Sequence, residues 1–125
     1  MTVYEALLQR RRTGRLHMTL LDPDKQSAAE AGRLAAGATR SGTDGIMVGG
    51  STGVTQQKVD ATVLAIKTST HVPTILFPAS AANLSRHADA LYFMSLLNSR
   101  DPRLIVGEQR KAAPIVRRRE AGGPD

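Results

Sequence analysis

The segment LHMTLLDPDKQ, residues 16–26, joins an apolar run to a charged turn. The run 16–21 is typical of a buried strand in a parallel sheet, because such strands are covered on both faces and are continuously apolar. The turn after it carries Asp22, Asp24 and Lys25 around a proline. Charge directly after a buried strand suggests that the strand leads to a polar edge of a sheet, where sites collect.

Predicted helices and strands alternate along the rest of the chain. Helix starts are indicated by capping-box spacings, Thr2 with Glu5 and Ser27 with Glu30, and by Thr55 as a cap. Three further apolar runs are expected to be strands, at residues 45–48, 72–77 and 90–94. Strands that alternate with helices form parallel sheets through right-handed crossovers. The sequence therefore predicts an α/β fold of parallel (βα) units, with four strands and the helices on the outside.

The C-terminal part is expected to form a last helix and a loose tail. Asp101 and Pro102 are typical of the cap and first turn of a helix. Pro114 is expected to kink or end this helix, because its ring lacks an N–H and clashes with the preceding turn. Residues 119–125 are expected to be frayed. The length of 125 residues suits one domain, covering residues 1–125.

Composition excludes several classes of protein. Hydrophobic residues make up 41% of the chain, enough for a packed core, and aromatic residues only 3%, so this core must be aliphatic. Cysteine is absent, which excludes disulfides and thiolate metal sites and suits a cytoplasmic location. No apolar run reaches about 18 residues, the length of a membrane span, and no secretion signal is recognisable.

The net charge of +6 raises the alternative of a nucleic-acid-binding module. The positive residues gather near the ends of the chain, at residues 10–12 and 117–119. No aromatic residues interleave with them, as a surface that stacks single-stranded bases would need. We therefore expect no nucleic-acid partner, and a nucleic-acid-binding module is the weakest interpretation of the sequence.

Small or polar residues follow each predicted strand. The segments are DPDK at 22–25, GGSTG at 49–53, PAS at 78–80 and SLLNSR at 95–100. In parallel α/β folds the carboxyl ends of the strands form one rim, and binding sites collect there. Four loops that are distant in the sequence are therefore expected to face one pocket.

The chemistry of two of these loops suits a magnesium ion and a diphosphate. Asp22 is a hard oxygen ligand of the kind that holds magnesium together with substrate phosphates. The glycines of GGSTG let backbone N–H groups approach an anion at the start of a helix. Ser51 or Thr52 can add a hydroxyl to a metal or a phosphate. Each motif also has an ordinary explanation: DPDK as a turn, GGSTG as a common connection, and Asn98 as a residue bonded to its local backbone.

A receiver-like doubly wound domain of similar length is disfavoured. Such a domain also carries acidic residues after its first strand, but its phosphoacceptor aspartate should follow the third strand. Here residues 77–80 read FPAS and contain no acid. The chain therefore lacks the nucleophile that phosphoacceptor chemistry needs.

Taken together, the motifs resemble the geranylgeranylglyceryl phosphate synthase family, which includes the bacterial heptaprenylglyceryl phosphate synthases. Residues 15–118 carry the resemblance, through HMTLLDPDK, SGTDGIMVGGSTGVT, PTILFPASA and LYFMSLLNSRDPRLIVGEQ in the order and approximate spacing of the family. The chain is closer to the archaeal branch, because Leu20 stands where the bacterial branch has a lysine.

The resemblance implies a magnesium-dependent prenyltransferase on a TIM (βα)8 barrel, of which this chain would form about half. Such an enzyme joins a polyprenyl diphosphate, here geranylgeranyl diphosphate, to the 3-hydroxyl of sn-glycerol 1-phosphate in the synthesis of ether phospholipids. The family's magnesium ligands match Asp22 and Ser51. We further expect Gly49, Gly50, Thr52 and Asn98 to bind substrate, and we assign no catalytic residue.

The chain also departs from the family, because the sequence stops after the fourth strand and the helix that follows it. The Tyr-Leu-Glu-Tyr segment and the later glycine-rich loops that hold glycerol phosphate in the family are not in this sequence. We expect the chain alone to bind magnesium and diphosphate weakly and not to turn over. Open sheet edges and an exposed apolar face predict a homo-oligomer, and transient contact with a membrane surface is also expected. The alternative is a non-catalytic phosphate-binding half-barrel or assembly module.

Overall fold

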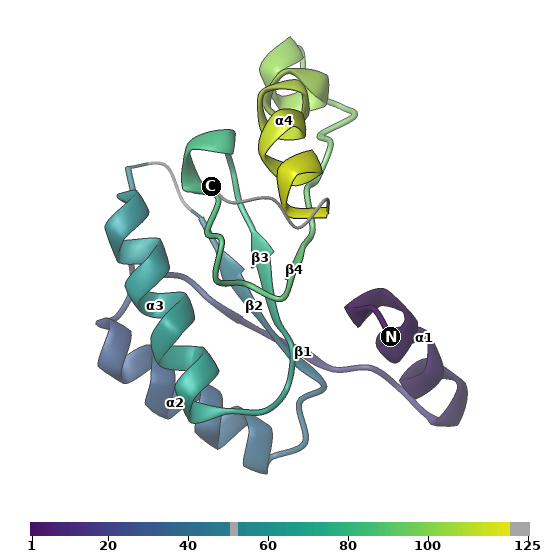
Figure 1. Ribbon diagram of the computed structural model, residues 1–125, viewed down its shortest axis with the longest axis vertical. Helices are drawn as coiled ribbons and strands as arrows, with labels where there is room; N and C mark the ends of the chain where they lie inside the picture. The colour runs from purple at the N-terminus through teal and green to yellow at the C-terminus, as the bar shows by residue number, and fades with distance from the viewer. Residues whose placement is uncertain (51–52, 121–125) are drawn as a thin grey trace.

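The computed structural model describes residues 1–50 and 53–120, with side chains as far as residue 118 (Figure 1). Helices and strands alternate, as the sequence predicts. The order is α1 Val3–Thr13, β1 Met18–Leu21, α2 Ala28–Arg40, β2 Gly45–Gly49, α3 Gln56–Ser69, β3 Thr74–Phe77, the 3-10 helix η1 Ala81–Asn83, β4 Ala90–Leu91, the π-helix η2 Arg103–Gly107 and α4 Glu108–Glu120.

The four strands form one parallel sheet in the order β1-β2-β3-β4, and α2 and α3 cover one of its faces (Figure 1). Leu21 is paired with Val48, and Val48 with Leu76, so these side chains share the face under the helices. Leu20 and Met47 alternate with them on the opposite face, where Leu20 is exposed. In a closed barrel that opposite face is the interior. The predicted α/β half-barrel with four parallel strands is therefore confirmed.

Local sequence signals explain where three of the helices begin. Thr2 and Glu5 form a complete capping box, in which each side chain accepts a hydrogen bond from the other residue's backbone N–H. The hydroxyl of Ser27 accepts from the amide of Glu30, and that of Thr55 from the amide of its third helical residue. These bonds satisfy amides that have no partner inside the helix.

Strand ends differ from the predicted ones. The predicted first strand began at Leu16, but β1 begins at Met18, because the His17 amide donates to the Asp44 carboxylate instead of to a neighbouring strand (2.9 Å). The predicted third strand began at residue 72, but β3 begins at Thr74, directly after a proline that cannot donate. The predicted fourth strand, 90–94, is reduced to Ala90–Leu91. The Tyr92 amide still donates to the Leu76 carbonyl of β3 (2.8 Å), but farther on the Leu96 amide donates to the Leu104 carbonyl in η2 (2.9 Å).

The core lies between the sheet and the two helices. Ile46 and Val48 of β2 are fully buried against the apolar face of α3. Helices α2 and α3 approach closely at Gly32, where an added Cβ would lie 2.8 Å from the hydroxyl of Ser69 and 3.1 Å from the carbonyl oxygen of Ala65. Small residues on α2 therefore set the spacing of the helix layer.

The C-terminal helix differs in detail from the expected one. The Asp101 carboxylate accepts from the Arg103 amide (3.0 Å), but the helix opens with a π-helical turn instead of an α-helical one. Pro114 is exposed and does not end the helix, because α4 continues to Glu120. Residues 121–125 lie outside the described part, so the frayed tail stays a prediction. Among the described helices, none has both the length and the apolar character to cross a membrane.

Candidate functional site

The parallel register brings the first two predicted loops to one edge of the sheet. Asp22 directly follows β1, and Gly49 ends β2. Because Leu21 is paired with Val48, the next residues, Asp22 and Gly49, leave adjacent strands at the same carboxyl end. Gly49 is in turn paired with Phe77, so the loop after β3 starts at that edge as well. The rim predicted from the sequence is thus present for these three strands.

The turn at Asp22 is held by its own backbone. One carboxylate oxygen, Oδ1, accepts from the Asp24 amide (2.9 Å), and the Asp22 carbonyl accepts from the Lys25 amide (3.0 Å). The Pro23 side chain is fully buried and anchors the turn to the sheet. Asp22 is half-buried at the rim, whereas Asp24 and Lys25 are exposed. Asp22 is therefore the carboxylate that the fold positions beside β2.

The glycine-rich turn packs against the loop after β3. A Cβ added at Gly50 would lie 3.5 Å from the backbone nitrogen of Ala79 and 3.5 Å from the side-chain nitrogen Nδ2 of the buried Asn83. Gly53 has a φ of 93°, which favours glycine because other residues are strained there. The turn leads into α3, so its backbone lies near a helix N-terminus, where amides favour anions.

The described residues do not cover all the predicted ligands. Ser51 and Thr52 lie outside the described residues, so their roles stay predictions. Within residues 1–50 and 53–120, no three His, Asp or Glu side chains gather as a metal cluster. A single half-buried carboxylate at the rim fits a magnesium ion that takes its other ligands from substrate phosphates and water.

Asn98 lies in the loop between β4 and η2. The side chain is exposed, and it makes no hydrogen bond with another described residue. Its loop is instead held by the Ser95 hydroxyl, which donates to the Ile105 carbonyl (2.7 Å), and by the Ser99 amide, which donates to the Leu96 carbonyl (3.0 Å). Within the described residues, therefore, no hydrogen bond joins Asn98 to Asp22 or Gly50.

Two residues that sequence reasoning missed hold the loops after β3 and β4. Glu108 accepts from the Ala81 amide (2.8 Å) and pairs with Lys111 (2.9 Å). The hydrogen bond from Lys111, followed by that from the Ala81 amide, lowers the pKa of the Glu108 carboxyl. Gln109 donates through Nε2 to the Met94 carbonyl (2.6 Å) and to a serine hydroxyl next to it. The Ala81 amide and the Met94 carbonyl lie more than a dozen residues from Glu108 and Gln109 in the sequence, so no local pattern signals these two bonds.

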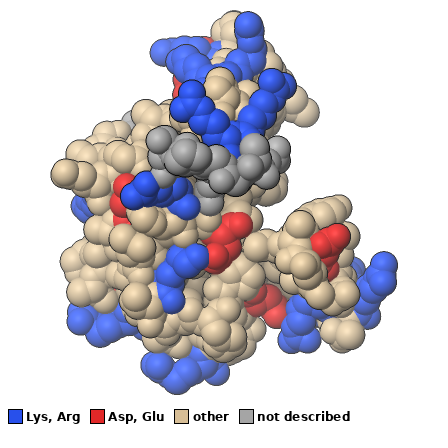
Figure 2. Space-filling view, viewed as in Figure 1, with Lys and Arg blue, Asp and Glu red and all other residues tan. Residues whose placement is uncertain are grey.

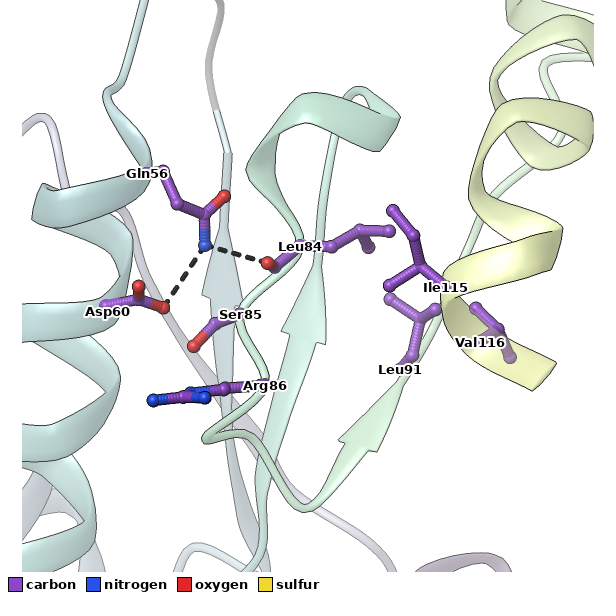
Figure 3. Close-up of a pocket in the computed structure, with 8 residues that line it drawn as sticks. All are labelled: Gln56, Asp60, Leu84, Ser85, Arg86, Leu91, Ile115 and Val116. Carbon is purple, nitrogen blue, oxygen red and sulfur yellow. Dashed lines mark hydrogen bonds between the residues drawn. The ribbon is translucent and has the colours of Figure 1, made fainter. Parts of the chain in front are cut away.

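A cavity of about 190 Å³ lies between α3, α4 and the connection from β3 to β4 (Figure 3). This connection contains only the short helix η1 and a loop, and the cavity lies beside it, between α3 and α4. Gln56 donates to the Leu84 carbonyl (2.7 Å) and to Asp60 (3.2 Å) on its polar side. The apolar side is formed by the side chains of Leu84, Leu91, Ile115 and Val116. No motif in the sequence predicts the residues that line this pocket.

Parallel (βα) units with loops gathered at the carboxyl rim define the class of the (βα)-barrel proteins, whose sites lie at this rim. Comparison with known proteins gives the particular family. The model of the PcrB family matches residues 7–120, and the chain belongs to that family.

The relatives support the resemblance seen in the motifs. The geranylgeranylglyceryl phosphate synthase of Thermofilum pendens is 54% identical over 108 residues, which are 86% of this chain and 42% of that protein. The solved structure of wild-type GGGPS from Thermoplasma volcanium is similar with a TM-score of 0.88 and 46% identity, over 93% of this chain and 47% of that one. The same values hold for (S)-3-O-geranylgeranylglyceryl phosphate synthase from Thermoplasma acidophilum, solved in complex with its substrate sn-glycerol-1-phosphate. The chain spans about half the length of the curated relatives that it matches.

Proposed function

We propose that this chain supplies the magnesium- and diphosphate-binding side of a prenyltransferase site. The reaction joins a polyprenyl diphosphate, such as geranylgeranyl diphosphate, to the 3-hydroxyl of sn-glycerol 1-phosphate in ether-lipid synthesis. The observation that carries the proposal is the register that leaves Asp22 and Gly49 on adjacent strands at one rim. The choice of reaction is supported by the relatives named geranylgeranylglyceryl phosphate synthase, whose sequences are 54% and 46% identical to this chain where they match it.

Each rim residue has a physical role in this proposal. Asp22 and Ser51 would hold the magnesium ion, which neutralises negative charge on a departing diphosphate. The backbone amides at Gly49 and Gly50 would bind phosphate oxygens near the start of α3. The exposed position of Asn98 leaves its side chain accessible to substrate, and Thr52 would add a hydroxyl. The Pro23 anchor and the bond from the Asp24 amide keep the Asp22 carboxylate in place at the rim.

The cavity between α3 and α4 suits the apolar tail of the prenyl substrate. Leu84, Leu91, Ile115 and Val116 line one side of it and would contact hydrocarbon. Burial of hydrocarbon contributes about 0.8 kcal/mol for each CH₂ group that leaves water. A long prenyl chain would therefore supply most of the binding free energy, and the rim would fix the position of the diphosphate.

The proposal also covers the location and assembly of the chain and its activity by itself. We propose that the chain is cytoplasmic, forms a homo-oligomer and contacts a membrane surface transiently. We also propose that the chain by itself binds magnesium and diphosphate weakly and does not turn over. The alternative function is that of a non-catalytic phosphate-binding half-barrel or assembly module, which the small-residue turn at Gly49 and Gly50 would also serve.

Calorimetric titration of this chain with geranylgeranyl diphosphate, with and without magnesium, tests the proposal. We expect binding that depends on magnesium and is lost in Asp22→Asn, since the amide has no charge to offer the cation. Asp24→Asn is the matched control, because Asp24 is exposed and lies two residues away. Equal binding by Asp22→Asn and the wild type would refute the role of Asp22. Binding of inorganic phosphate without any effect of magnesium or prenyl chain would favour the non-catalytic alternative.

A further inference from the structure

Four large apolar side chains are exposed in the segment between β4 and α4. They belong to Leu96, Leu97, Leu104 and Val106, which we call the apolar tip. All four are exposed, and Leu97 has 83% of its surface in contact with solvent. The hydrogen bond between the Leu96 amide and the Leu104 carbonyl joins the two segments that carry them (2.9 Å). Exposed apolar side chains held together in this way are typical of an interaction surface.

Positive charge surrounds the apolar tip. Residues 93–118 contain six basic side chains and two carboxylates, and both carboxylates are paired. Asp101 is bound to Arg103 (2.6 Å) and Glu108 to Lys111 (2.9 Å). In the described part of the chain, the other four basic residues take part in no ion pair: Arg100, Arg110, Arg117 and Arg118. Figure 2 shows Lys and Arg side chains gathered over α4, at the top of the view.

The spacing on α4 places cations and an apolar residue on one face. Lys111, Ile115 and Arg118 are four and three residues apart, so they project from one side of the helix, and Arg110 and Arg117, seven residues apart, project from the adjacent side. All five are exposed, and we call them the basic face of α4. Helices that lie in the interface of a membrane combine lysine and arginine with exposed aliphatic side chains in this manner.

We propose that the apolar tip and the basic face of α4 dock on an anionic membrane surface. The Leu97 and Leu104 side chains would enter the head-group region, and Arg110, Arg117 and Arg118 would contact lipid phosphates. A second copy of the chain is a poor occupant, because two like-charged surfaces repel. A single-stranded nucleic acid is also disfavoured, because the apolar tip has no aromatic ring on which bases can stack. The inference deepens the membrane contact proposed above, but it rests on exposure and charge and not on the proposed reaction, so the reaction and the docking surface can each fail without the other.

Flotation with lipid vesicles tests this surface on the chain as it exists. The wild type should bind vesicles that contain phosphatidylglycerol and should not bind vesicles of pure phosphatidylcholine. Arg110→Glu with Arg117→Glu should weaken binding roughly 25-fold or more, at about fivefold for each cation removed. Arg33→Glu with Arg40→Glu on α2 is the matched control, because it changes the net charge equally and should retain much more of the binding.

The apolar part has its own pair of variants. Leu97→Asp should reduce vesicle binding, whereas Tyr4→Asp, at a side chain 71% exposed on α1, should not. Both positions are so exposed that folding is preserved, which circular dichroism checks. The proposal is overturned if the wild type ignores phosphatidylglycerol, or if the two charge variants lose binding equally. It is also overturned if single-stranded RNA removes the protein from vesicles and binds with the same sensitivity to Arg110 and Arg117, or if Leu97→Asp only dissociates a dimer.

Discussion

Gly32 and Gly37 lie on the same helix, α2, and should respond in opposite directions to replacement by alanine. At Gly32 a new Cβ would lie 2.8 Å from the Ser69 hydroxyl oxygen and 3.1 Å from the Ala65 carbonyl oxygen of α3. At Gly37 the nearest atom would be a guanidinium nitrogen of Arg40 at 3.8 Å, an ordinary contact. The two substitutions are chemically identical, so the neighbouring helix alone distinguishes them.

The magnitudes follow from two opposing effects. Alanine is more favourable than glycine in a helix interior by about 1 kcal/mol, and this gain applies to both positions. Overpacking against a tightly packed neighbour costs about 1–3 kcal/mol, and this cost applies only to Gly32. We therefore expect Gly37→Ala to stabilise by about 1 kcal/mol, and Gly32→Ala to lie between no effect and a loss of about 2 kcal/mol. The difference between the two variants measures the steric cost directly.

Urea unfolding followed by circular dichroism gives the free energies of unfolding. Removal of the Ser69 hydroxyl in Gly32→Ala with Ser69→Ala should recover part of the loss, because one of the two close atoms is gone. The rest should persist, since the Ala65 carbonyl belongs to the backbone of α3. If Gly32→Ala and Gly37→Ala stabilise the chain equally, the close packing of α2 on α3 is refuted.

Three further predictions concern a cap, a buried strand residue and a carboxylate. Thr55→Ala should destabilise the chain by about 1 kcal/mol through loss of the α3 cap, measured by urea unfolding. An unchanged free energy of unfolding would show that the cap does not stabilise the chain. Ile46→Ala should destabilise by about 2–5 kcal/mol, because Ile46 is fully buried in β2, and a loss below this range in the same assay would place it outside the core. The bonds from Lys111 and the Ala81 amide lower the pKa of Glu108, so their contribution is fully present above the unfolded value near 4.5 and is lost as the pH falls through the folded-state value. The protection of the Ala81 amide against hydrogen exchange, taken relative to its intrinsic exchange rate at each pH, should therefore fall at low pH in the wild type but not in Glu108→Gln, and identical pH profiles of protection would contradict this reasoning.

The sequence by itself determined the α-helices and strands and their order. Capping at Thr2, Ser27 and Thr55 and the four apolar runs depend on residues within a few positions of one another, which is why local patterns reveal them. Parallel pairing then follows from the alternation of strands and helices, and it brings Asp22 and Gly49 to one rim. The family was also visible in the sequence, because its motifs are the loops at that rim.

Only the tertiary structure decided how the loops are held and what lies between the helices. The fourth strand is shorter than its apolar run, because the chain after Tyr92 bonds to η2 through the Leu96 amide instead of to β3. Glu108 and Gln109 reach loops that are distant in the sequence, and the cavity depends on how far α4 lies from α3. Contacts of this kind depend on the distances between whole elements in space, and residue spacing along the chain does not contain those distances.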